Sequence, residues 1–230
     1  MKRIGILGGM GPEATILYYS YITGEYNKRF GDYAFPEIII YSVKFQQFLD
    51  LFYEGKWETV SDEVLRGLDR LHRAGADFGI MATNTLHRVF EMIQKRSPLP
   101  LISIIDSVIE AIKSEKMQTV GLLATMFTMK EGFYVNRLRK EGIQTILPER
   151  KDQQRIQEII VSELTIGRVE SGSKEAFLRI IDKLENRGAK GIILGCTEIP
   201  LLLHPEECNL RLFNSTLLHA ESALRYALAS

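Results

Sequence analysis

Hydrophobic positions along the chain fall into two alternating patterns. Short continuous apolar runs predict buried strands, at residues 3–7, 37–41, 78–81, 101–103, 119–123, 145–147 and 191–194. Longer stretches with apolar residues at helical spacing predict helices, which include 12–30, 57–73, 129–140, 156–164, 174–186 and a last helix from 214 to the C-terminus. Strands that alternate with helices predict an α/β fold, in which helices cover both faces of a mostly parallel sheet.

The sequence also matches itself. Residues 3–10 (RIGILGGM) align with residues 119–126 (TVGLLATM) at an offset of 116. Residues 75–83 (GADFGIMAT) align with residues 188–196 (GAKGIILGC) at an offset of 113. Two matches in the same order, each displaced by about half the chain, predict a duplicated α/β unit. We place one lobe at 1–102 plus 206–230, and the other at 103–205.

Charge and cysteine content narrow the class of protein. The chain has 29 basic and 29 acidic side chains, a formal net charge of zero, whereas nucleic-acid binders and anionic-membrane binders carry a basic excess. No stretch approaches the ~20 apolar residues of a membrane helix, and Pro12 and Glu13 interrupt the first apolar run too early for a signal peptide. Only Cys196 and Cys208 occur, so no disulfide framework is expected, and we predict a cytoplasmic protein.

Four polar or glycine-rich turns follow predicted strands, at residues 8–11, 83–85, 124–128 and 195–198. In open parallel sheets, ligands bind beyond the carboxyl ends of the strands. We expect each turn to open a helix, with Asn84, Thr125 and Thr197 as caps, and free N–H groups at these helix starts would hold a carboxylate or phosphate. Capping alone accounts for any single turn, but four such turns together favour a ligand site.

Two common cofactor patterns are incomplete. The glycines at 9–14 resemble a dinucleotide-binding loop, but the second strand ends in Tyr-Ser-Val-Lys at 41–44, without the acidic residue that binds the ribose. The histidines are scattered and neither cysteine has a partner at ligand spacing, so no metal and no cofactor are predicted. His87 reads as a hydrogen-bonded structural histidine that could also orient a neighbour.

Cys196 is the strongest candidate for chemistry. It follows a buried strand and opens a predicted helix, a position that lowers the pKa of a thiol and favours the thiolate. Glu198 opposes this effect through its charge unless it faces a substrate ammonium. The alternative is a small apolar residue that closes a strand, and Cys208, in a polar loop, reads as incidental.

Three segments carry a resemblance to a known family: residues 4–15 (IGILGGMGPEAT), 84–87 (NTLH) and 194–202 (LGCTEIPLL). They resemble the aspartate/glutamate racemase superfamily, most closely its aspartate racemase branch, and the resemblance runs essentially end to end. It implies a cofactor-independent amino-acid racemase of two pseudo-symmetric lobes with the active site between them, usually a homodimer. Two lobes suit racemisation because one acid/base group must flank each face of the α-carbon.

The resemblance also implies roles for individual residues. Most members have cysteine at both catalytic positions, and here these positions are Cys196 and Thr83. Because an alcohol is a far weaker acid than a thiol, we expect asymmetric catalysis, with one enantiomer handled faster. The residues expected to bind the amino-acid substrate are Met10, Asn84, Thr85, Thr125, Thr128, Thr197 and Glu198.

One departure from the aspartate racemase pattern concerns the substrate. Typical members hold the side-chain carboxylate with an arginine and a lysine, and the corresponding stretches here, 45–52 and 162–167, contain neither. Lys44, Gln46 or Gln47 could substitute, or the substrate could be a less polar amino acid. Two other functions remain open: a single-cysteine decarboxylase or isomerase of the same superfamily, and a catalytically impaired amino-acid-binding homologue.

Overall fold

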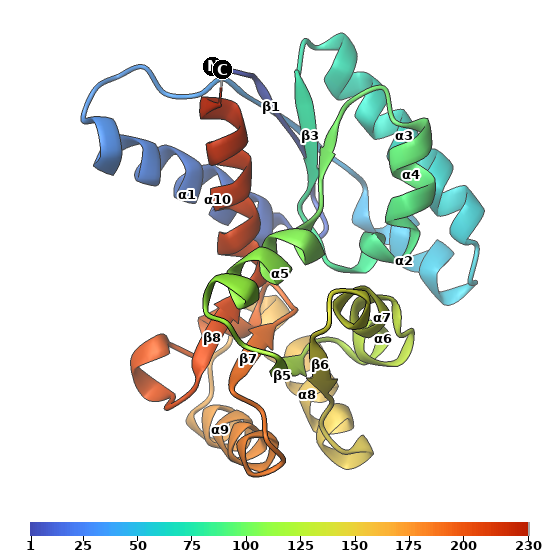
Figure 1. The fold of residues 1–230 in the computed structure, drawn as a ribbon. Helices are drawn as coiled ribbons and strands as arrows, with labels where there is room; N and C mark the ends of the chain where they lie inside the picture. The colour runs from blue at the N-terminus through green and yellow to red at the C-terminus, as the bar shows by residue number, and fades with distance from the viewer. Residues whose placement is uncertain (230) are drawn as a thin grey trace. The chain divides into compact units, whose positions relative to one another are not determined.

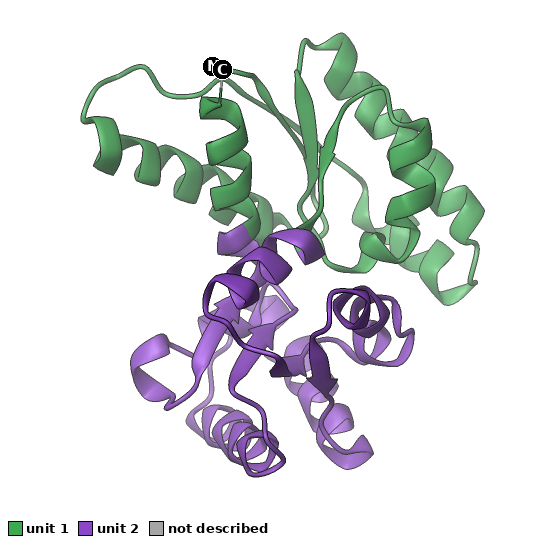
Figure 2. Cartoon of the chain, viewed as in Figure 1, with its two compact units in different colours: residues 1–104, 219–230 green, residues 105–218 purple. Residues whose placement is uncertain are grey.

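The computed structural model describes residues 1–229, which form two compact units (Figures 1 and 2). Unit 1 consists of Met1–Ile104 and the segment that begins at His219, and unit 2 is Ile105–Leu218. Each unit contains one four-stranded sheet in which all neighbouring strands are parallel. The strand orders are β2-β1-β3-β4 and β6-β5-β7-β8. This identical order confirms the duplicated α/β unit predicted from the internal match.

The elements of unit 1 are strands β1 (Ile4–Gly8), β2 (Ile38–Ser42), β3 (Phe78–Met81) and β4 (Leu101–Ile102), and helices α1 (Pro12–Phe30), α2 (Phe45–Tyr53), α3 (Trp57–Arg73), the 3₁₀ helix η1 (Thr85–Val89), α4 (Phe90–Arg96) and most of α10 (Ser215–Leu228). Alternate side chains of its central strands point to opposite faces. Ile4, Ile6 and Ile80 pack with α1 and α10, whereas Leu7 and Met81 pack with α3 and α4. Helices therefore cover both faces of this sheet, as Figure 1 shows.

The elements of unit 2 are strands β5 (Thr119–Leu123), β6 (Gln144–Ile146), β7 (Gly191–Leu194) and β8 (Arg211–Asn214), and helices α5 (Ile104–Ser114), α6 (Met126–Lys130), α7 (Phe133–Lys140), α8 (Arg150–Ser162), the 3₁₀ helix η2 (Leu164–Ile166), α9 (Ser171–Asn186) and the 3₁₀ helices η3 (Ile199–Leu201) and η4 (Pro205–Glu207). Its central strands β5 and β7 are buried along nearly their whole length. Gly121 lets the side chains of Ile192 and Leu184 pack directly against the backbone of β5. A Cβ at this position would lie 2.7 Å from Ile192 and 3.0 Å from Leu184.

All seven predicted strands are present. The bounds of β3, β5 and β7 match the prediction, and the other four differ by one or two residues. The eighth strand, β8, was not predicted. Its sequence, Arg-Leu-Phe-Asn, has only two apolar residues between polar ends, which is too weak a pattern to separate it from a loop.

The helices follow the prediction less closely. The bounds of α1 and α3 match it, but the helix expected at 129–140 is two helices, because Gly132 adopts a left-handed conformation (φ 73°) between α6 and α7. Helix α8 begins six residues earlier than expected, α9 three, and α2, α4 and α5 were not among the helices named. The last helix is α10, and its expected end at residue 230 lies outside the described residues.

The division into units differs from the predicted one at its second boundary. The chain enters unit 2 after Ile104 and returns to unit 1 at His219, whereas the return was predicted at residue 206. The reason is β8, which pairs with β7 along four residues and thus holds the intervening segment in unit 2.

Candidate active site

The turn after β3 contains Thr83 and runs to His87; we call residues 82–87 the Thr83 turn. The N–H of Thr83 donates to the carbonyl of Met81 (2.8 Å), which bends the chain sharply at the strand end. The Thr83 side chain is 8% exposed. Since β3 pairs with β1 at the centre of the sheet, Thr83 occupies the carboxyl end of a central strand, where such sheets bind ligands.

Buried His87 holds the backbone of this turn. Its Nδ1–H donates to the carbonyl of Thr83 (3.0 Å), and the N–H of Ile104 donates to its Nε2 (3.0 Å). These two partners assign one neutral tautomer, because a carbonyl only accepts and an N–H only donates. Burial, with a contribution from His219, lowers the pKa of His87 to about 3. The prediction of a hydrogen-bonded structural histidine is confirmed.

A second buried histidine lies beside the first. The rings of His87 and His219 meet edge to face with centroids 6.1 Å apart. The hydroxyl of Tyr18 donates to Nδ1 of His219 (2.7 Å), and its Nε2–H donates to the carbonyl of Ile102 (2.9 Å). Burial lowers the pKa of His219 to about 4. Sequence reasoning gave Tyr18 and His219 no role, because their partners lie far away along the chain.

Asn84 and Thr85 complete the Thr83 turn. Asn84 is 4% exposed, and its carbonyl accepts from the N–H of His87 (3.1 Å). The prediction that its side chain caps a helix is wrong, since no capping bond forms and the helix that follows is the short 3₁₀ helix η1, which starts at Thr85. Thr85 is partly exposed.

The glycine loop after β1 lies next to the Thr83 turn, because β1 and β3 are neighbours. Gly9 has φ +90°, and a Cβ there would lie 2.6 Å from the hydroxyl of Ser42, so only glycine fits. Its N–H donates to the hydroxyl of Thr15 (2.9 Å). The Met10 side chain is 4% exposed and belongs to the apolar cluster on the α3 side of the sheet. Thr15, which shapes this loop, was not among the predicted site residues.

The equivalent turn of unit 2 follows β7; we call residues 195–199 the Cys196 turn. The Cys196 thiol is 7% exposed and donates to Oε2 of Glu198 (2.9 Å). Burial raises the pKa of this thiol well above its ordinary value, and the Glu198 carboxylate raises it further. The expectation of a thiol acidified by a helix start is wrong, because the turn leads into a three-residue 3₁₀ helix whose dipole is too small to offset burial.

Glu198 gathers the polar side chains of the Cys196 turn. Its Oε2 accepts from the hydroxyl of Thr197 (2.7 Å) as well as from the Cys196 thiol. The prediction that Thr197 caps a helix is therefore wrong, since its hydroxyl is committed to Glu198. One carboxylate oxygen thus fixes both neighbouring side chains.

The turn after β5 lies beside the Cys196 turn, since β5 and β7 pair. Thr125 caps α6, as predicted: its hydroxyl accepts from the N–H of Thr128 (3.4 Å) and lies 3.1 Å from the Thr128 hydroxyl. Thr128 is 1% exposed. The amide oxygen of Gln157, on α8, accepts from the N–H of Met126 (2.8 Å). Sequence reasoning missed Gln157, and this bond occupies one of the N–H groups expected to hold an anion.

Two of the three residues considered as substitutes for the missing cations, Gln46 and Gln47, are engaged elsewhere. The amide of Gln46 donates to Asp50 (2.8 Å), and that of Gln47 donates to Glu63 (3.0 Å). Both glutamines and Lys44 are exposed, at or near the start of α2. These interactions leave Lys44 as the cation closest in sequence to the expected position.

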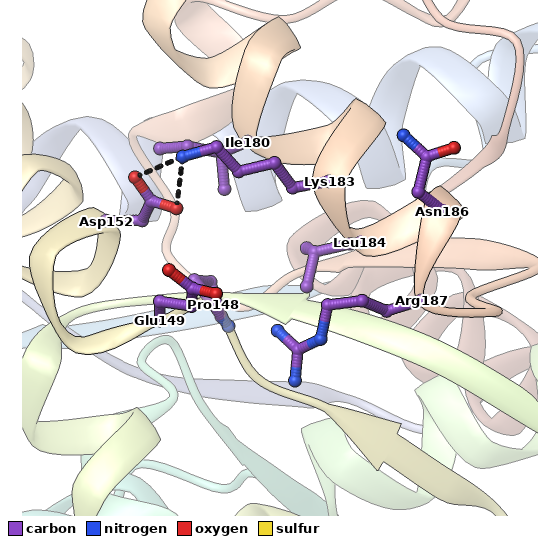
Figure 3. A pocket seen from close by; sticks show the side chains of 8 residues that line it. All are labelled: Pro148, Glu149, Asp152, Ile180, Lys183, Leu184, Asn186 and Arg187. Atoms are coloured by element: carbon purple, nitrogen blue, oxygen red, sulfur yellow. Dashed lines mark hydrogen bonds and ion pairs between the residues drawn. The ribbon is translucent and has the colours of Figure 1, made fainter.

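A separate hollow of about 340 Å³ lies in unit 2 and contains none of the predicted site residues (Figure 3). Its lining includes Lys183, which is bound to both carboxylate oxygens of Asp152 at 3.0 and 2.9 Å. Arg187 donates to the carbonyl of Leu147 (2.8 Å). Both cations thus bind groups of the protein itself, and none of the residues predicted for the reaction lines the hollow.

The described part of the chain has neither a group of metal-ligating side chains nor a membrane-spanning helix. Within residues 1–229, no three His, Cys, Asp or Glu side chains group in a way that would hold a metal ion. No helix over the same range combines the length and apolar character needed to cross a membrane.

Comparison with known proteins places the chain in a family. The model of the family described as Asp/Glu/Hydantoin racemase matches residues 7–223. The chain belongs to this family. The resemblance drawn from three sequence segments is confirmed. The assignment to the amino-acid racemases is confirmed as well. Independence from pyridoxal phosphate is consistent with membership of this family.

Individual relatives are similar to this protein over nearly the whole chain. The broad specificity amino-acid racemase RacX of Bacillus subtilis is 24% identical, with 98% of both chains covered. A protein from Yersinia pestis assigned to the Asp/Glu racemases is 38% identical in its crystal structure (TM-score 0.93; 99% of this chain and 100% of that chain). An aspartate racemase homologue from Pyrococcus horikoshii OT3 is 35% identical (TM-score 0.89; 99% and 100%). The predicted fold class, two α/β lobes with parallel sheets, is confirmed.

Proposed function

We propose that this family member racemises an amino acid without a cofactor, by proton transfer at the α-carbon between Cys196 and Thr83. The observation that carries the proposal is their equivalence: each is the second residue after the third strand of its duplicated unit, β7 or β3. Both side chains are nearly buried. A reaction that takes a proton from one face and returns one to the other needs two such groups.

Cys196 works from a protonated resting state in this proposal, because burial and Glu198 hold the pKa of its thiol high. We assign the α-ammonium of the substrate to Glu198, whose carboxylate attracts a cation. Partial neutralisation of Glu198 by that ammonium removes part of the charge that opposes the thiolate. Substrate binding thereby favours loss of the thiol proton to solvent. The resulting Cys196 thiolate takes the α-proton, while the C–H electron pair passes into the substrate carboxylate.

Thr83 supplies the proton on the opposite face. Its hydroxyl proton bonds to the α-carbon, and the resulting alkoxide recovers a proton from Cys196 or solvent. The hydroxyl of threonine is a much weaker acid than a thiol, so proton donation by Thr83 is the slower half of the reaction. Because two enantiomers have equal free energy in water, the asymmetry appears in kcat and in solvent exchange, while kcat/KM is equal in both directions.

The remaining predicted residues would bind the amino acid. We assign its α-carboxylate to polar groups beyond β1, β3 and β5, at Met10, Asn84, Thr85, Thr125 and Thr128, and its ammonium side to Thr197 and Glu198. The absence of an arginine or lysine in 45–52 and 162–167 favours a neutral or moderately polar side chain over aspartate. The broad specificity of RacX, the relative from Bacillus subtilis, points the same way.

The proposal also includes a cytoplasmic homodimer. Cys196 and Cys208 are both free thiols, which suits a reducing compartment. Light scattering after gel filtration measures the assembly directly, and fractionation of cells that make the protein measures its location.

The test is α-proton exchange in deuterated water, followed by NMR over a panel of L- and D-amino acids. Wild type is expected to exchange and racemise one or more of them. Cys196→Ala is expected to lose racemisation by about 10²–10⁴-fold, as expected for removal of a general acid/base. Cys208→Ala, which removes the other cysteine, serves as the matched control and keeps full activity.

Two outcomes contradict this assignment. Exchange that survives Cys196→Ala unchanged removes the thiol from the reaction. Release of CO₂ from substituted malonates, without racemisation of any amino acid, identifies instead the single-thiol decarboxylation open to a chain with one cysteine at the site.

A further inference from the structure

Helix α1 has an apolar side that its own unit does not cover. Residues 14–24 contain no charged side chain. Ala14, Tyr18 and Ile22 face the sheet and are buried, but Ile16 is 58% and Tyr19 is 50% exposed. Helices that are apolar on both sides are typical of helices covered on both sides. The charge pattern of α1 thus predicts a second covering layer.

A groove of about 630 Å³ runs beside this side of α1. It lies between the helix, the loop that follows it and the edge strand β2, and its lining is Tyr19, Ser20, Thr23, Gly24, Asn27, Phe35, Pro36 and Ile38. Further apolar side chains flank it, with Tyr33 94% exposed, Phe30 52% and Ile40 42%. We call these groove and flanking residues, with Ile16, the α1 face. Figure 1 shows α1 and its loop on one side of unit 1.

We propose that the α1 face binds the same face of a second copy of this chain. The six large apolar side chains exposed here leave roughly 700 Å² accessible, taking their exposed fractions and about 200 Å² for a whole side chain. That area approaches the ~800 Å² per partner of a standard stable interface and exceeds the ~300–600 Å² of the largest patch on typical monomers. The proposal deepens the homodimer of the proposed function, and its test needs no racemase activity.

A two-fold arrangement suits the order of residues along α1. Small residues lie at the middle of the face, and a Cβ on Gly24 would meet nothing within 4 Å, so a second helix has room to approach. Acidic Glu13 lies in the first turn and basic Lys28 in the last. Antiparallel pairing of two α1 helices brings the acidic end of each to the basic end of the other, as an isologous contact requires.

The test places a charge in the middle of the face. Gly24→Arg is the chosen variant, because arginine favours a helix more than glycine does and open space receives its side chain. Tyr19→Glu is a second variant on the same face. Val161→Glu, at a 56% exposed apolar residue of α8 in unit 2, is the matched control. Sedimentation equilibrium measures the dimer dissociation constant of each.

Wild type and Val161→Glu are expected to be dimers at micromolar concentration, whereas both α1 variants dissociate with a dissociation constant raised about 100-fold or more. Melting temperature should depend on protein concentration for wild type but not for Gly24→Arg, and this second readout separates dissociation from misfolding. Dimers that persist unchanged in both α1 variants overturn the surface while leaving the homodimer intact. Monomeric wild type overturns both, and leaves the face to a different partner.

Discussion

The Thr83 turn and the Cys196 turn follow equivalent strands of a duplicated unit, yet they are held by opposite kinds of chemistry. In unit 1, neutral His87 bridges two backbone groups, the carbonyl of Thr83 and the N–H of Ile104. In unit 2, the Glu198 carboxylate binds the reactive side chain itself, the Cys196 thiol. The first support fixes backbone position without adding charge, and the second adds a negative charge at the atom that must lose a proton.

The two units thus share their strand order but differ in the polar groups that support each turn. Removing a proton from Cys196 depends on what neutralises Glu198, so its reactivity is tied to the substrate's charge. Thr83 has no such dependence on a neighbouring charge in its own turn, and its reactivity is limited by the weak acidity of an alcohol. Three experiments either remove this difference or make it measurable, and a fourth tests the neighbouring turn after β5.

The largest effect on the rate of racemisation is expected from replacing the Thr83 side chain, either with alanine or with the cysteine found in the equivalent turn. Thr83→Ala should lower racemisation by about 10²–10⁴-fold because one face of the α-carbon loses its proton donor. Thr83→Cys should exceed wild-type kcat and bring the kcat values of the two enantiomers closer. Circular dichroism of the amino acid follows both. Equal activity in wild type and Thr83→Ala would exclude Thr83 as the second base.

The histidine support predicts acid sensitivity of unit 1. The pKa values of His87 and His219 are lowered to about 3 and about 4, below the ~6.5 of the unfolded chain. The unfolded state therefore binds more protons below about pH 6.5, and stability present above that pH is lost towards pH 3–4. Unfolding free energy should fall by about 4 kcal/mol between pH 8 and pH 5.

Urea unfolding at a series of pH values measures this loss. His87→Gln should reduce the pH dependence by about half, because one of two buried titrating groups is removed. His72→Gln, at an exposed histidine of α3, is the matched control and should keep the wild-type dependence. A wild-type free energy that is flat between pH 8 and pH 5 would contradict the buried neutral pair.

Removing the charge from the Cys196 turn gives a smaller effect on the reaction. Glu198→Gln should lower the pKa of the Cys196 thiol, since the carboxylate contributes to raising it. The rate of thiolate-dependent exchange should then rise at lower pH than in wild type, while KM increases because the ammonium loses its partner. Glu206→Gln, at an exposed acid of η4, controls for a general change in charge. A pH profile identical to wild type would detach Glu198 from the thiol.

The smallest expected effect concerns the cap of α6. Thr125→Ala removes the bond to the N–H of Thr128 and should lower the unfolding free energy by about 1 kcal/mol. Thr165→Ala, which removes an exposed hydroxyl that donates to the carbonyl of Val161, should change it by less. Thermal unfolding of the two variants side by side distinguishes a cap from an ordinary surface bond.

Most strands and helices could be predicted from the sequence, because their formation depends on the local pattern of apolar residues. Strands β3, β5 and β7 are mostly apolar runs that each follow a polar residue (Asp77, Gln118 and Lys190), and their bounds were correct. Strand β8 has too few apolar residues to stand out, and the break at Gly132 depends on one backbone angle. Because β8 was missed, the second unit boundary was predicted too early. Because the turn at Gly132 was missed, α6 and α7 were predicted as one helix.

For the candidate site, the sequence predicted which positions are involved but not the hydrogen bonds or the pKa shifts of their side chains. Sequence reasoning located the turns beyond the central strands, but it reversed the direction of the pKa shift at Cys196, because burial cannot be read from a residue's neighbours in the chain. The hydrogen bonds from the N–H of Ile104 to His87 and from the N–H of Met126 to Gln157 join residues 17 and 31 positions apart. Such pairings follow from packing, which local patterns do not encode.

The return of the chain to unit 1 at His219 has a consequence for synthesis on the ribosome. Unit 2 is one uninterrupted segment, so all of its strands have been made before α10 is complete. The core of unit 1 instead needs Ala220, Ala223 and Leu224 from α10 beside strands made much earlier. The second unit can therefore finish folding first, and the turn that carries Thr83 gains its His219 neighbour only after the whole of unit 2 has been synthesised.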